Sequence, residues 1–559
     1  MAERKIEAKG RKSFASAVAA AYLCAIMGLS GCSAQVSDTA AGQSQDTSSA
    51  AQASVQGSES ASVSSGANAS ASAGTSDADS SANVTASSTA SKGTAPKESD
   101  IQVNEVYEDS GNGTHAIEAD GTQESYQNAA VTKTGDSDSG DEADFYGDNA
   151  AIFATNDATL DLTEMVIKTN GTHANAVFSY GEGTTVNVSD SVIETTGNCS
   201  GGLMTTGGGT MNATNLNIHT TGNSSAAIRS DRGGGTVNVD GGSYTTDGTG
   251  SPVIYSTADI TVANASMEST ASQGVVIEGK NSVTLNNVNM VADNNTKNSD
   301  KSDYYQAVMI YQSMSGDAAQ GASTFTMTDG TLENQNGDVF FVNNTVTTIN
   351  LERASIINND ESGVFLRAAA AGWGNEGSNG GQVTLNAASQ AIDGDMVVDD
   401  VSNLNLYLRD GSTFTGAINA DGQAGDVYVE LESGSVWTLT DDSYITSLTC
   451  DADSIDLNGH LLYVDGKAYE AGSASTGIAI EATVSFGGQG GPGSGGPGDG
   501  GTPPDAPGGE GGGQGGLGQG GPGGDGGTPP EKPSGGAPGG SGSSGPGGTP
   551  PEKPTSSSS

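Results

Sequence analysis

Positive charge and aromatic side chains are both scarce in this chain of 559 residues. Lys and Arg number 20 against 67 Asp and Glu, so the net charge is −47, and aromatic residues make up only 5%. We expect no nucleic-acid binding, because neutralising phosphates needs clusters of Lys and Arg, and none occurs after the first 12 residues. Glycine, by contrast, contributes 85 residues, roughly double the usual ~7%. We therefore expect much of the chain to be low-complexity linker, with a core confined to its middle part.

Histidine is rare too, and its four copies are scattered along the chain. They are His115, His173, His219 and His460. A zinc site or a Ser-His-Asp triad needs a matched set of side chains, and this spacing indicates neither. The sequence therefore predicts no metal site, no cofactor and no recognisable catalytic motif.

The N-terminus has the features of a secretory signal. A cluster of five Lys and Arg residues precedes an uncharged stretch from Ser13 to Gly31, which matches the charged and apolar regions of a signal peptide. The stretch ends in Leu29-Ser30-Gly31-Cys32, which resembles the bacterial lipobox, a motif cleaved before its cysteine. That resemblance implies removal of residues 1–31, acylation of Cys32 and anchorage to the bacterial cell membrane with exposure at the cell surface. An uncleaved membrane anchor is the alternative, and both place the rest outside the cytoplasm.

Two low-complexity arms flank the middle of the chain. Residues 32–100 are almost wholly small and polar, and residues 487–559 are rich in Gly and Pro. Neither arm has enough apolar surface to offset chain entropy, so we expect both to be disordered. The first suits a tether that holds a domain clear of a membrane. The second is either a brush that threads the cell wall or a solubilising tail.

Residues 101–486 repeat an apolar triplet at near-constant spacing. The central residues lie 25, 26, 25, 26 and 23 positions apart and are Ile152, Val177, Leu203, Ile228, Ile254 and Ile277. Further short alternating runs follow the triplets, with Gly, Asn or Asp at the corners. Three short strands per repeat describe one coil of a right-handed parallel β-helix, an all-β solenoid that buries every second side chain. A β-sandwich is the competing architecture, although its strands need not repeat at a fixed register.

A solenoid would keep the two cysteines of this region apart. Cys199 and Cys450 are separated by about nine coils, or ~40 Å at ~4.8 Å per coil, which is beyond the reach of a disulfide bond. We expect each to be a small buried or turn-side thiol.

Equal positions in successive coils lie above one another, so the residues after the central apolar positions form a ladder. It runs through Phe153, Phe178, Met204, Arg229, Tyr255, Glu278, Tyr311 and Arg367, with an ambiguous coil at 341–343. The insertions 291–306, 312–323 and 368–381 gather at the same edge, and long loops on a regular scaffold often carry function. We predict an outward-facing strip whose candidate ligand-binding residues are Arg229, Asp231, Arg232, Tyr255, Glu278, Lys280, Tyr311, Asp317, Arg367 and Trp373.

A strip of Tyr and Trp rings with interspersed charges suits a polysaccharide. The leading hypothesis is an adhesin or polysaccharide-binding protein that recognises a glycan of a host or neighbouring cell. Two alternative functions stay open. One is a structural surface spacer, in which the ladders only stabilise the stack of coils, and the other is a polysaccharide lyase or glycoside hydrolase of the β-helix type. For the enzyme, Asp231, Glu278 and Asp317 would supply the acids.

Other acidic groups are expected to be solvated turns. They are the pairs Asp399-Asp400 and Asp441-Asp442 and the loop from Asp136 to Asp144. The loop is acidic enough to bind Ca²⁺ weakly, but it lacks the spacing of an EF-hand.

Several stretches resemble a family of bacterial secreted β-helix proteins that are usually called adhesin-like. They are Arg229-Ser-Asp-Arg-Gly-Gly-Gly-Thr-Val, Gly250-Ser-Pro-Val-Ile-Tyr-Ser-Thr, Val276-Ile-Glu-Gly-Lys-Asn-Ser, Ile310-Tyr-Gln-Ser-Met-Ser-Gly-Asp-Ala and Gly372-Trp-Gly-Asn-Glu-Gly-Ser-Asn-Gly-Gly. The resemblance covers roughly residues 105–470 and implies the fold more than the function. More loosely, the chain is similar to clostridial β-helix lipoproteins that bind acidic plant polysaccharides and to autotransporter stalks. It lacks the catalytic motifs of pectate lyases and polygalacturonases.

Overall fold

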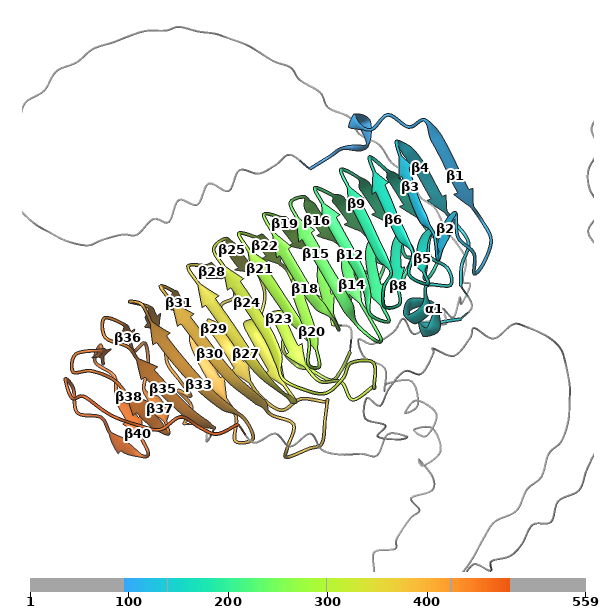
Figure 1. The fold of residues 1–559 in the computed structure, drawn as a ribbon. Coiled ribbons are helices and arrows are strands. Elements are labelled where there is room, and N and C mark those ends of the chain that lie inside the picture. The colour runs from blue at the N-terminus through green and yellow to red at the C-terminus, as the bar shows by residue number, and fades with distance from the viewer. Residues whose placement is uncertain (1–94, 138, 298, 423–424, 483–559) are drawn as a thin grey trace, which may run out of the picture. The chain divides into compact units, whose positions relative to one another are not determined.

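The computed structural model describes residues 95–482 except 138, 298 and 423–424, and this part of the chain is a parallel β-helix (Figure 1). Equivalent strands of successive coils pair in parallel and build three long sheets, which we name A, B and C. Two smaller sheets lie near the C-terminal end, and one of them holds an antiparallel pair. The prediction of an all-β solenoid is confirmed.

Between residues 117 and 358, each coil contributes one strand to sheet B, then one to sheet C, then one to sheet A, and the later coils add no strand to sheet A. Sheet A contains β1 (Glu105–Asp109), β4 (Ala129–Lys133), β7 (Val166–Thr169), β10 (Val192–Thr195), β13 (Asn217–Thr220), β16 (Ser243–Thr246), β19 (Ser266–Ser269), β22 (Asn289–Ala292), β25 (Thr331–Asn334) and β28 (Ser355–Asn358). Sheet B contains β2 (Ile117–Asp120), β5 (Ile152–Thr155), β8 (Val177–Tyr180), β11 (Leu203–Thr206), β14 (Ile228–Ser230), β17 (Ile254–Ser256), β20 (Val275–Glu278), β23 (Gln306–Tyr311), β26 (Asp338–Asn343), β29 (Val364–Ala368) and β32 (Asp395–Val398). Sheet C contains β3 (Gln123–Gln127), β6 (Thr159–Thr163), β9 (Thr185–Ser189), β12 (Gly209–Thr214), β15 (Gly235–Asp240), β18 (Asp259–Ala263), β21 (Ser282–Asn286), β24 (Ser323–Thr328), β27 (Thr345–Glu352), β30 (Gly381–Ala388), β33 (Asn403–Arg409), β35 (Asp426–Leu431) and β38 (Ser447–Thr449).

The remaining elements are short. One small sheet contains β31 (Ala391–Asp393), β34 (Thr413–Thr415), β36 (Val436–Thr438) and β39 (Ile455–Asp456), and the other contains β37 (Ser443–Ile445), β40 (Leu462–Val464) and β41 (Lys467–Ala468). The helices are the 3-10 turn η1 (Glu98–Asp100) and α1 (Asp141–Tyr146). Within the described ranges, no helix is long and apolar enough to cross a lipid bilayer.

The interior of the solenoid is an apolar column that runs through the coils. Ile152, Val177, Leu203 and Ile228 stack in register on neighbouring strands of sheet B and are fully buried. Strand alternation places their neighbours on the opposite face, so each strand has one inward and one outward row. The first five apolar triplets therefore occupy equivalent coil positions, as the repeat predicted, whereas Ile254 lies beside Val275 and not beside Ile277.

The corners of the coils depend on residues that tolerate unusual backbone geometry. Between sheets C and A, Asp190, Asn215 and Asn264 adopt φ values of 49°, 50° and 55°, a left-handed conformation that short polar side chains support. Between sheets A and B, glycines stack directly: a Cβ on Gly197 would lie 1.9 Å from the carbonyl oxygen of Gly171. These corners explain why Asn, Asp and Gly recur at the repeat spacing.

The outer face of sheet B carries a second layer. The segment that contains α1 lies between β4 and β5, residues 293–305 join β22 to β23, residues 312–322 join β23 to β24, and residues 369–380 join β29 to β30. Two further apolar clusters lie outside the solenoid core, one around Phe153 and Phe178 and the other around Tyr311 and Trp373. The insertions therefore cover this face, and the face is a second core.

Both ends of the described chain lie against the solenoid. Asn217 on β13 donates to the carbonyl oxygen of Pro96 at 2.9 Å, so residues 95–100, predicted to belong to the tether, pack on sheet A. At the other end, Asn405 on β33 bonds both backbone groups of Ile480 at 2.9 and 3.0 Å. The predicted signal peptide with Cys32, the rest of the tether and the tail fall in residues 1–94 and 483–559, outside the described residues.

The two described cysteines differ in state. Cys450 is a free, buried thiol, as predicted. Cys199 is also buried, but it is disulfide-bonded, so the prediction of a thiol there is wrong.

Candidate functional site

The first half of the predicted ladder has the register that the sequence indicated. Phe153, Phe178, Met204, Arg229 and Tyr255 lie beside one another on successive strands of sheet B. All five side chains point away from the solenoid interior, because each follows an inward apolar residue.

Two later members of the predicted ladder, Glu278 and Tyr311, lie two residues beyond the row that contains Tyr255 and Arg367. Tyr255 lies beside Val276 rather than Glu278, and Glu278 lies beside Tyr311. A shift of two residues keeps every side chain on its predicted face of the sheet. The predicted face is therefore correct, and the predicted neighbours on adjacent strands are wrong. The ambiguous coil is resolved as well, since Phe341 stands between Met309 and Arg367.

The prediction that this strip is exposed is wrong. Seven of the ten candidate ligand-binding residues are buried: Arg229, Asp231, Tyr255, Glu278, Tyr311, Asp317 and Trp373. Arg367 is 15% exposed, and only Arg232 and Lys280 are open to solvent. The cause is the fold of the insertions, which lie over the strip instead of beside it. The aromatic rings of this strip are therefore not available for stacking on sugar rings.

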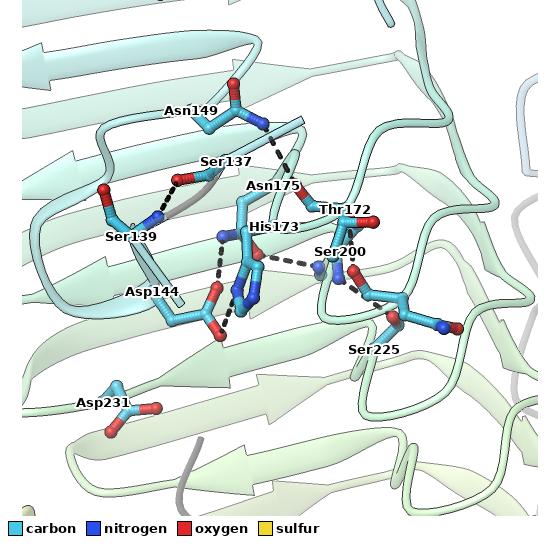
Figure 2. Close-up of polar contacts among 12 residues, drawn as sticks. Ser137, Ser139, Asp144, Asn149, Thr172, His173, Asn175, Ser200, Ser225 and Asp231 are labelled. Carbon is cyan, nitrogen blue, oxygen red and sulfur yellow. Dashed lines mark hydrogen bonds and ion pairs between the residues drawn. The ribbon is translucent and has the colours of Figure 1, made fainter. Parts of the chain in front are cut away.

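A buried ion network forms the centre of this covered face. Arg229 donates to Asp144 at 3.1 Å and to Asp231 at 2.8 Å, and all three side chains are at most 5% exposed. Asp144 also accepts from Asn175 at 3.0 Å and lies 3.2 Å from His173 Nδ1 (Figure 2). Asp144 belongs to α1, 85 residues from Arg229, so this network fastens the helix to the sheet.

The two carboxyl groups beside Arg229 have opposite pKa shifts. Burial alone would raise the pKa of Asp144, but Arg229 and His173 outweigh burial and hold that pKa below its ordinary value. Burial raises the pKa of Asp231 to about 7, and the charges of Asp144 and Asp317 add to this effect against the opposing Arg229. The Arg229 guanidinium therefore keeps Asp144 ionised, whereas Asp231 keeps its proton to near-neutral pH.

Glu278 is the focus of a second polar group on the same face. Its carboxylate accepts hydrogen bonds from the hydroxyl groups of Tyr255 at 2.6 Å and Tyr311 at 3.0 Å, and Ser313 is a third donor. Burial raises the pKa of Glu278 in spite of these donors. Ser313 lies in the 312–322 loop, so Glu278 joins that loop to the sheet.

Arg232 connects two of the covering segments. Its guanidinium donates twice to Asp317 Oδ1, at 2.6 and 3.1 Å, and lies 3.8 Å from the ring centroid of Phe145 in α1. Trp373 closes the far end of the layer, with its ring 5.1 Å from that of Tyr311 in an edge-to-face contact. Cations and aromatic rings thus hold the second layer together.

An exposed rim of aromatic and cationic side chains borders this layer. Tyr146 at the end of α1 is 47% exposed and meets the half-buried Tyr180 edge-to-face at 5.9 Å. The Arg232 side chain, also 47% exposed, lies beside them. At the other end, Arg367 stacks 4.1 Å from the centroid of Tyr304, which is 39% exposed.

Sequence reasoning missed the rim and the role of α1. The acidic loop was expected to be solvated, whereas Asp144 is fully buried and Asp136 accepts a hydrogen bond from the Thr172 amide at 2.8 Å. The aromatic pair Phe145-Tyr146 at the end of that loop was the available signal, since exposed acidic loops seldom end in two adjacent rings. Asp399 was also expected to be solvated, but it caps the amide of Ala370 at 2.7 Å.

Two groups of side chains bring possible metal ligands within 4.8 Å of one another: Asp144, His173 and Cys199, and, far from the rim, Asp441, Asp442 and His460. The sulfur of the first group is taken up in a disulfide bond, and its carboxylate is held by Arg229. In the second group, Asp442 Oδ1 accepts the Leu461 amide at 2.8 Å and the Asp441 side chain is 68% exposed. Neither arrangement is a preformed coordination sphere.

Comparison with known proteins identifies no relative of this chain. No protein family, no curated protein and no solved structure matches this chain. A proposal of function therefore depends on the fold and on the geometry of this face.

Proposed function

We propose that this protein is a lipoprotein anchored at the bacterial cell surface through Cys32, and that its β-helix is an adhesin that binds polysaccharide. The binding surface is the end of the rim that Tyr146, Tyr180 and Arg232 form, rather than the buried ladder. The observation that carries the proposal is the gathering of the α1 segment and of residues 312–322 and 369–380 on the outer face of sheet B, with exposed rings and a guanidinium at their edge. Sugar rings stack on such aromatic faces, and their hydroxyl groups pair with Arg and carboxylate side chains.

The charge of the chain narrows the ligand class. A net charge of −47 repels anionic polymers, and the rim offers few cations to counter that repulsion. A neutral glycan is therefore the favoured ligand, and an acidic one would need a bridging cation such as Ca²⁺.

The test is affinity electrophoresis of the full chain through gels cast with neutral and acidic polysaccharides, with and without Ca²⁺, followed by staining for polymer. The proposal predicts slowed migration in at least one neutral polymer, with the polymer left intact. Unchanged migration in every gel would reject glycan binding and favour a plain surface spacer.

A polysaccharide lyase or glycoside hydrolase is the second candidate, and the raised pKa values of Asp231 and Glu278 favour it. Asp231, whose pKa burial raises to about 7, keeps its proton to near-neutral pH and therefore suits a general acid. Both groups are fully covered, so catalysis would require residues 312–322 to swing away. A cleared zone in the stained gel that disappears in Asp231→Asn is the result that would establish this function.

A further inference from the structure

Residues 312–322 form a loop over the outer face of sheet B, and hydrogen bonds to its main chain fix both ends. Asn344 donates to the carbonyl oxygen of Gln312 at 2.8 Å, and the Lys280 amide donates to that of Ala319 at 2.9 Å. Gly316 lies between these anchors, with a φ of 91° and open space around it. Glycine adopts such angles without strain, so the middle of the loop is free to bend between its fixed ends.

The middle of the loop is fastened to the rest of the molecule by two of its side chains. Ser313 donates a hydrogen bond to Glu278 at the end of β20. Asp317 accepts two hydrogen bonds from Arg232, at 2.6 and 3.1 Å. Each contact includes a carboxyl group, so the position of the loop depends on the charges that this face carries.

Acids outnumber cations among the side chains of this covered face. Four carboxyl groups are at most 7% exposed: Asp144, Asp231, Glu278 and Asp317. Two guanidinium groups pair with them, since Arg229 bonds Asp144 and Asp231 while Arg232 bonds Asp317. A buried charge without a counter-charge is costly. Charge balance on the closed face is therefore reached when two of the four carboxyl groups hold a proton.

Two further basic side chains lie at the edge of this group. Lys301 is half-buried, and its charge interacts with that of Glu278. His173 lies 3.2 Å from Asp144. Within the part of the chain that the structure describes, neither base forms an ion pair with Asp231 or Glu278. They therefore do not take the place of the two protons.

Asp231 and Glu278 are the two groups that hold these protons. Burial raises the pKa of Asp231 to about 7, and the charges of the buried α1 carboxylate and of Asp317 add to this effect. Burial also raises the pKa of Glu278, and Asp317 again adds to the effect. Tyr255 and Tyr311 stay neutral beside them, because burial holds their pKa values well above the ordinary value. Asp317 on the loop is therefore repelled by both carboxyl groups of the sheet once these ionise.

We propose that residues 312–322 form a pH-sensitive lid, which is closed over sheet B in acid and opens above neutral pH, when Asp231 and Glu278 both carry charge. In the closed lid these groups hold protons that solvated carboxyl groups release at about pH 4, so closing takes up protons. Closure is therefore strongest at acidic pH and weakens as the pH rises through about 7. An open lid uncovers the rings of Tyr255 and Tyr311. Their use in glycan binding rests on the proposed function, whereas the movement of the lid does not.

Hydrogen–deuterium exchange of the full chain, read by mass spectrometry at about pH 5 and about pH 9, tests the lid. After correction for the intrinsic pH dependence of exchange, peptides that cover residues 312–322 should lose about tenfold or more of their protection at the higher pH. Peptides that cover β24 and β27 should keep theirs. The double variant Asp231→Asn/Glu278→Gln imitates the protonated groups and should keep the loop protected at both pH values. Asp259→Asn/Glu268→Gln, the same change at two exposed residues, should behave like the wild type.

Two results would overturn the proposal. One is equal protection of residues 312–322 at both pH values in the wild-type chain, a comparison that needs no variant to fold. The other is a loss of protection at the higher pH that persists in Asp231→Asn/Glu278→Gln, with circular dichroism showing that this variant is folded. No polysaccharide is present in these measurements, so a failure of the lid and a failure of glycan binding are separate results.

Discussion

The hydroxyl group of Tyr255 donates a hydrogen bond to Glu278 at 2.6 Å, although the residue beside Tyr255 on the next strand is Val276. The contact is therefore diagonal, and it is made on a face that insertions seal from solvent. Diagonal pairs of this kind are within reach of long and aromatic side chains. The face is thus organised as a polar and aromatic core, and its chemistry reaches solvent only at the rim.

Replacing Asp231 with Asn should change how stability depends on pH. The folded chain holds a proton on Asp231 up to a pKa of about 7, whereas the unfolded chain releases it near 3.8. Because the folded state binds more protons between these values, the free energy of unfolding falls as pH rises from about 4 to 7. Asp231→Asn removes that dependence, so the difference between variant and wild type should change by about 2–4 kcal/mol between pH 4 and 8.

Urea denaturation followed by circular dichroism at several pH values measures this difference. Asp303→Asn, at a side chain that is 93% exposed, is the control and should show no such change. A constant difference between Asp231→Asn and wild type across the pH range would contradict a protonated Asp231 in the folded chain.

The two tryptophans should report the two cores separately. Trp437 lies in the solenoid interior, stacked on Phe414 at 5.4 Å, whereas Trp373 lies in the second layer. The insertions lie outside the hydrogen-bonded stack of coils, so they should open at a lower denaturant concentration. Trp437→Phe, which leaves Trp373, should therefore show a red-shifted emission at lower urea than Trp373→Phe does. Coincident transitions would mean that the second layer and the solenoid unfold as one unit.

The fold was predictable from the sequence because the coil repeat is a local pattern, but the cover over sheet B was not. Alternation shows which side chains leave the interior and does not show whether another layer meets them. The signal lay in the strands themselves: Val339-Phe340-Phe341-Val342 is apolar at every position, as strands buried on both faces are. The register shift at Glu278 escaped detection because two coils of different length fit the same alternation.

The stacked glycines between sheets A and B should tolerate no side chain. A Cβ on Gly197 would lie 1.9 Å from the Gly171 carbonyl oxygen, so Gly197→Ala must displace backbone, and we expect a loss of about 3 kcal/mol or more. Gly316 in the 312–322 loop has open space around it but a φ of 91°. Gly316→Ala should therefore cost only about 1 kcal/mol. Equal losses in thermal or urea denaturation would contradict the close contact as the reason for glycine at 197.

Migration of two double variants through a gel that contains the retarding polysaccharide is the most direct test of the proposed binding surface. Tyr146→Ala/Tyr180→Ala removes the two rings, one exposed and one half-buried, at the Arg232 end of the rim. Tyr444→Ala/Tyr463→Ala removes a matched pair, stacked at 4.9 Å, near the C-terminal end of the solenoid. We predict that the first variant migrates as if no polymer were present, since each stacked ring contributes roughly 1 kcal/mol or more, while the second is retarded like the wild type. Full retardation of Tyr146→Ala/Tyr180→Ala would contradict the assignment of glycan binding to the rim.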